Sequence, residues 1–152
     1  AAWGRRTVFS QGDFMYTAIP LMVISLILYN VIALFSGADM AEFLSRGVDF
    51  SLRSGDWRLT IGDGFVILSL VFLFAEVVKS TTTGANAIIN HALSMIIFIV
   101  FLIEFILMTG FATSTFFIIM CMQLLDVVAG FTISIVAAKR DLGVASPVIG
   151  TN

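Results

Sequence analysis

Several ionisable and amide side chains lie within long apolar runs of the sequence, where such groups are rare. They are Glu76, Asn90, His91, Glu104, Gln123 and Asp126. An ionised side chain at membrane depth costs about 2.5–3.5 kcal/mol, so each one needs a partner or a role. Spaced carboxylates and a histidine are what a proton relay or a cation path requires. The six residues are therefore candidates for an ion or proton path, or else for polar contacts between helices.

Helical geometry arranges these residues on three levels across a membrane. With a rise of about 1.5 Å per residue, Glu76 and His91 fall on one level, Asp126 on the next and Glu104 on the third. Asp126 shares a helix face with Gln123, and Glu104 shares one with Asn90, whereas His91 lies off the main polar face of its helix. Glu76 also has Lys79 three residues away, a spacing typical of a local ion pair.

The composition excludes several kinds of site within this chain. Its single cysteine, Cys121, cannot form an intrachain disulfide, and its single histidine cannot supply a bis-histidine haem site. We predict no metal and no cofactor. No nucleophile and base stand at a recognisable spacing, so no catalytic residues are predicted and a role other than catalysis is favoured. The net charge of −2 gives no reason to expect a nucleic-acid partner.

The elements that carry these residues are those of a membrane protein. The 152 residues are 59% hydrophobic and 12% charged, whereas about a quarter of the residues in a soluble domain are charged. A chain of this length forms a single domain, residues 1–152, and cannot bury so much apolar surface within itself. We therefore expect the excess apolar surface to face the lipid bilayer or a partner.

Four apolar runs predict four transmembrane helices, at about residues 17–35, 61–79, 85–108 and 113–138. About 20 residues are needed to cross a bilayer, and backbone groups in lipid must be satisfied within each span. The second run reaches that length only when its polar ends are included. The first run is longer than the apolar part of a usual signal peptide, so we expect a retained anchor.

The charges outside the spans predict the topology. Five of the eight Lys and Arg residues fall on the side that holds both termini, and three fall in the long loop 36–60. This bias favours a topology with both termini inside. It also favours a multi-pass protein of the bacterial inner (cytoplasmic) membrane. In the outer loop, Asp39 to Arg46 predicts a short amphipathic helix, and the alternation on either side of Ser54-Gly55-Asp56 predicts a β-hairpin. We expect the tail 142–152 to be loosely ordered.

These features leave three functional hypotheses. The first is a non-catalytic integral membrane subunit, or accessory protein, of a larger inner-membrane complex, with other membrane subunits or further copies of itself as partners. The alternative is a small homo-oligomeric proton or cation channel or transporter that uses the intramembrane carboxylates. The third is a membrane enzyme acting on lipid through Glu76, His91 and the threonine-rich link 80–84. The third has the least support, because it lacks a nucleophile–base pair.

Overall fold

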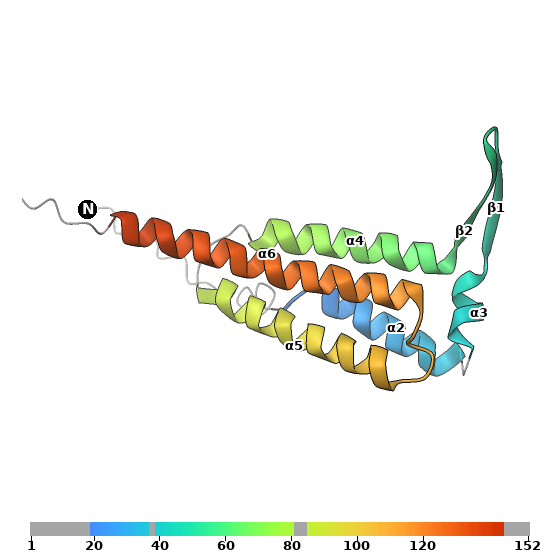
Figure 1. Ribbon diagram of the computed structural model, residues 1–152, viewed down its shortest axis with the longest axis horizontal. Coiled ribbons are helices and arrows are strands. Elements are labelled where there is room, and N and C mark those ends of the chain that lie inside the picture. The colour runs from blue at the N-terminus through green and yellow to red at the C-terminus, as the bar shows by residue number, and fades with distance from the viewer. Residues whose placement is uncertain (1–18, 37–38, 81–84, 145–152) are drawn as a thin grey trace, which may run out of the picture.

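The computed structural model describes residues 19–36, 39–80 and 85–144, and they are mostly helical (Figure 1). Three helices are long and apolar enough to cross a membrane: α4 (Ile61–Ser80), α5 (Ala85–Leu107) and α6 (Ser114–Val144). They confirm the mostly helical fold, and their length and apolar composition are those of membrane-spanning helices. Their bounds lie close to those predicted, except that α6 continues past residue 138, because a helix need not end where its apolar segment ends.

The first predicted span is described in part, as helix α2 (Met22–Ser36). Its 15 residues extend about 22 Å, which is shorter than the roughly 30 Å hydrocarbon core. Residues 17–18, which the prediction included, lie outside the described residues, as do 81–84 and 145–152. Four spans and their orientation therefore remain predictions, whereas three long apolar helices are observed.

The loop between α2 and α4 has the two predicted elements. Helix α3 (Met40–Ser45) is followed by strands β1 (Gly47–Leu52) and β2 (Gly55–Thr60), which pair antiparallel as a hairpin. The hairpin joins α4 without a linker, because Thr60 and Asp63 cap the helix reciprocally. The Thr60 N–H donates to Asp63 Oδ2 at 2.9 Å, and the Asp63 N–H donates to Thr60 Oγ1 at 3.0 Å.

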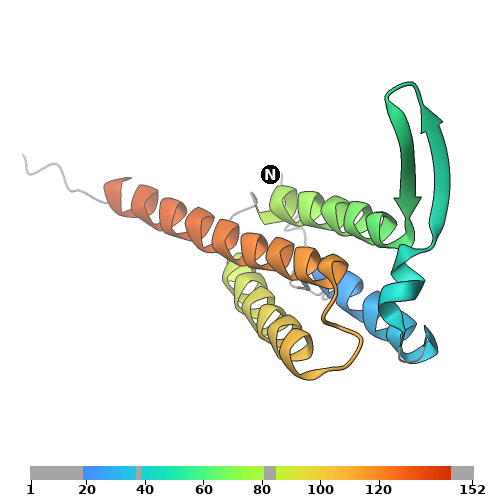
Figure 2. The same ribbon diagram turned by 45° about the vertical axis from the view of Figure 1, so that its right-hand side comes forward.

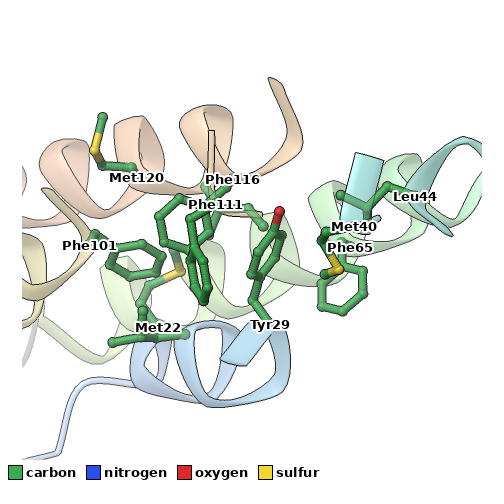
Figure 3. Close-up of a cluster of buried hydrophobic side chains, with 11 residues drawn as sticks. Met22, Tyr29, Met40, Leu44, Phe65, Phe101, Phe111, Phe116 and Met120 are labelled. Atoms are coloured by element: carbon green, nitrogen blue, oxygen red, sulfur yellow. The ribbon is translucent and has the colours of Figure 1, made fainter. Parts of the chain in front are cut away.

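Helix α6 packs against both α4 and α5, and α2 packs against α4, so the buried faces meet inside one bundle. Toward the end that carries the hairpin, aromatic rings fill the interior around Tyr29 (Figure 3). The Tyr29 ring lies 4.6 Å from Phe116 and 5.3 Å from Phe111 between centroids, and Phe116 lies 5.2 Å from Phe101. We call this part of the bundle the aromatic half.

Candidate functional site: a buried polar cluster

The other half of the bundle buries polar side chains from three helices, and we call it the polar half. Each of these side chains is 2% exposed or less, although each one ends in a polar or ionisable group. Helix α4 supplies Glu76, α5 supplies Asn90, His91 and Ser94, and α6 supplies Gln123 and Asp126. Five of the six residues predicted from the sequence thus lie in one cluster, and the sixth, Glu104, does not.

Glu76 lies at the point where α4, α5 and the start of α2 meet. Its Oε2 accepts the backbone N–H of Leu21 at 2.8 Å, and its Oε1 accepts the Asn90 amide. Lys79 Nζ lies 3.1 Å from Glu76 Oε1 and donates to the Ile19 carbonyl at 2.8 Å. The two charged residues therefore fix the beginning of α2, where a carboxylate is also favoured by the helix dipole. Sequence spacing predicted this ion pair but could not identify the backbone partners.

Asp126 and Gln123 extend the cluster on α6. Gln123 Nε2 donates to the Ser94 carbonyl at 3.1 Å and lies 3.3 Å from Asp126 Oδ2. Asp126 also lies close to Ser94, Glu76 and His91. The first two predicted levels of polar residues are therefore a single group in the folded chain.

His91 is held in place by the shape of α6 rather than by hydrogen bonds. The imidazole fits against Gly130, where even a single β-carbon would overlap ring atoms of His91. Neither ring nitrogen has a hydrogen-bond partner, although the side chain is buried. The helical pattern of α5 placed His91 off the polar face of that helix. This pattern could not show that Gly130 on α6 leaves the space in which the imidazole fits.

Unpartnered polar atoms gather in this cluster. Among the described residues, the buried side-chain atoms without a hydrogen-bond partner are Asn90 Oδ1, both His91 ring nitrogens, Ser94 Oγ and Gln123 Oε1. Such atoms are rare in folded proteins because each costs about 1–3 kcal/mol. Within the described ranges, no group of three His, Cys, Asp or Glu side chains is arranged to hold a metal ion.

Glu104 lies in the aromatic half, with a different partner. Asn30 Nδ2 on α2 donates to both Glu104 oxygens, at 3.1 and 3.0 Å. Ser94 and Glu104 are ten residues apart on α5, or about 15 Å, and the buried ring of Phe101 lies between them in the sequence. Sequence reasoning did not identify Asn30, although a lone amide within the first apolar run was a usable signal.

Comparison with known proteins gives no relative for this site. The chain matches no protein-family model, no curated protein and no solved structure. The chemistry of the polar cluster is therefore argued from its own geometry.

Proposed function

We propose that this chain is a small membrane protein that binds and passes protons or a small cation, as a channel or transporter protomer. The observation that carries the proposal is the polar cluster: Glu76, His91 and Asp126 lie buried together, beside polar atoms that no protein group satisfies. Ionisable residues at membrane depth are rare, and they mark ion pathways and proton relays.

The arrangement supports a path that begins at the Glu76 end. The Lys79 side chain is 20% exposed while its partner Glu76 is fully buried, so this ion pair connects the cluster to the surface. From there, the free nitrogens of His91 can accept and release a proton, with the Asp126 carboxylate nearby to stabilise an imidazolium. Farther along, the completely buried side chains of Phe101, Phe116 and Ile119 fill the interior. Passage across the aromatic half therefore requires a second conformation or a neighbouring copy.

We also propose how the chain lies in the membrane. Three long apolar helices support a membrane protein, and we propose that α2 with the residues before it forms a fourth span. The charge bias supports a bacterial inner membrane with both termini inside.

Proton flux through reconstituted vesicles tests the function. We expect the wild-type protein to dissipate an imposed pH gradient, and Asp126→Asn to slow dissipation on the order of 100-fold, the scale of a lost proton-transfer group. Asparagine keeps the shape of the side chain and its contact with Gln123, so a folding defect is not expected. Glu42→Gln, which removes an exposed carboxylate of α3, is the matched control. Wild-type vesicles no leakier than empty ones would contradict the proposal.

A second candidate is the accessory-subunit role, and a different surface favours it. Leu34 and Phe35 of α2 are 82% and 87% exposed. Phe35 lines an open groove of about 420 Å³ that also has Phe43, Asp39, Glu42 and Arg46 along its walls. Exposed apolar groups beside charged ones are typical of a protein contact. The polar stripes themselves do not support this role, because they lie inside the chain.

The native mass after gentle extraction separates the two candidates. Migration within a large complex that contains other chains would support the accessory subunit. We expect Phe35→Asp to release the protein from such a complex, whereas Phe74→Asp, on the apolar side of α4, is the control for a general loss of membrane packing. A discrete species that contains this chain alone would contradict the subunit role.

A further inference from the structure

The hairpin has one apolar face and one polar face. Directly paired residues of two antiparallel strands lie on the same face, and successive residues alternate between faces. Phe50 pairs with Trp57 and Val48 with Leu59, so these four side chains share a face with Leu52. The opposite face carries Asp49, Ser51, Asp56 and Arg58, where Arg58 binds Asp49 and Ser51 binds Asp56.

The described chain leaves this apolar face uncovered. The exposed fractions are 62% for Val48, 43% for Phe50, 54% for Leu52 and 51% for Trp57. The Phe50 and Trp57 rings pack on each other across the strands, 5.9 Å apart between centroids. A two-stranded hairpin by itself is marginally stable in water. The apolar face therefore needs a medium or a partner to cover it.

The position of the hairpin indicates what covers it. It leaves the end of α4 crosswise to the helices and extends outward past α4, not over the bundle (Figures 1 and 2). On α4 itself, the apolar side chains of Leu70, Val71 and Phe74 are more than half exposed. This is the surface that a spanning helix turns to lipid. A hairpin that extends sideways from the end of such a helix is level with the membrane surface.

We propose that the hairpin is a membrane-surface element, and that its apolar face enters the boundary between headgroups and acyl chains beside α4. Aromatic side chains with a polar edge, such as Trp57, favour this depth. The polar face with Asp49 and Arg58 then faces water. Because Arg53 and Arg58 balance Asp49 and Asp56 within residues 47–60, the contact depends on apolar lipid and not on anionic headgroups. The inference is independent of the proposed proton site, which lies in the other half of the bundle.

Fluorescence of Trp57 tests the placement. The chain has two tryptophans, so Trp3→Phe leaves Trp57 as the single probe. The protein is reconstituted into phosphatidylcholine vesicles that contain lipid brominated near the headgroup, with iodide on both sides of the membrane. We expect brominated lipid to quench Trp57, iodide to quench it several-fold less than free tryptophan, and anionic lipid to leave the quenching by brominated lipid unchanged. Quenching by iodide alone would overturn the proposal. Protection from both quenchers would also overturn it, because a protein partner or a second copy would then cover the face.

Neighbouring residues on opposite faces provide the matched variants. Val48→Ser with Leu52→Ser reduces the apolar face, and we expect it to raise iodide quenching of Trp57 several-fold. Ser51→Ala changes the polar face next to Leu52 and should leave the quenching unchanged. Equal effects of the two variants would overturn the proposal. Proton flux measured on the same vesicles reports separately on the polar cluster.

Discussion

The two halves of the bundle differ in how completely their buried groups are satisfied. In the aromatic half, the Tyr29 hydroxyl lies 2.6 Å from Thr113 Oγ1 and 3.3 Å from the Gly110 carbonyl, and the Glu104 carboxylate accepts from Asn30. In the polar half, Asn90, His91, Ser94 and Gln123 keep unpartnered atoms, among the residues that the structure describes.

The difference distinguishes a structural core from the candidate site. Close-packed rings lock one arrangement, since a well-packed interior resists small displacements. Buried polar atoms without partners lower stability, and they persist where a proton, water or ligand uses them. The aromatic half is therefore the structural core, and the polar half holds the atoms on which the proposed function depends.

The largest effect is expected from truncation of the aromatic half. Phe116 is fully buried and contacts the rings of Tyr29, Phe101 and Phe111. We expect Phe116→Ala to lower the free energy of unfolding by about 3 kcal/mol, the lower end for such a change, because the unfolded chain in lipid still has apolar surroundings. Phe74→Ala, at a side chain 70% exposed on α4, is the control and should change stability little. Equilibrium unfolding in mixed detergent measures both, and equal losses would contradict a packed aromatic core.

The next largest effect is expected at Gly130, in the polar half. A β-carbon at Gly130 would overlap the His91 ring, so Gly130→Ala should destabilise the protein by roughly 1–3 kcal/mol. At Gly64 an added β-carbon meets nothing within 4 Å, so Gly64→Ala should be neutral or stabilising by up to about 1 kcal/mol through helix propensity.

A double variant shows whether the cost arises at the histidine. His91→Ala in the Gly130→Ala background removes the ring that the new methyl group meets, so the two changes should cost less together than the sum of each alone. Additive costs would mean that Gly130 is required for another reason, and that His91 is not confined by α6.

The sequence predicted the long helices and the hairpin because strong local signals mark them. The apolar runs after Thr60 and Thr113 begin at capping residues, and Thr113 Oγ1 accepts the Phe116 N–H at 3.2 Å. Alternation around Gly55, whose φ is +138°, placed the turn of the hairpin. The start of α2 at Met22 was less predictable, since it depends on Glu76 of another helix.

Helical periodicity grouped the candidate residues where one helix carries the pattern, and it could not group them where two helices create the contact. Asp126 and Gln123 share one face of α6, so periodicity grouped them, and both are buried. His91 has no such signal, because the space that admits it is the missing side chain of Gly130. Likewise, three levels of polar residues followed from spacing alone, but spacing does not show that the Phe101 and Phe116 rings fill the interior of the aromatic half.

The smallest effect is expected in the hairpin, whose stability should depend on pH, whereas that of the aromatic half should not. The hydrogen bonds from Arg58, 2.6 and 2.8 Å from the Asp49 oxygens, hold the pKa of Asp49 below its ordinary value. A lowered folded-state pKa stabilises the hairpin above the unfolded-state pKa, and that contribution is lost as the pH falls through the folded-state value. We therefore expect slightly faster amide exchange in β1 and β2 below about pH 4, after correction for intrinsic rates, with no change in the aromatic half. Arg58→Gln should remove this pH dependence. An acid response that persists in Arg58→Gln would show that the hairpin senses pH through another group, and a response shared with the aromatic half would show that the two regions do not open independently.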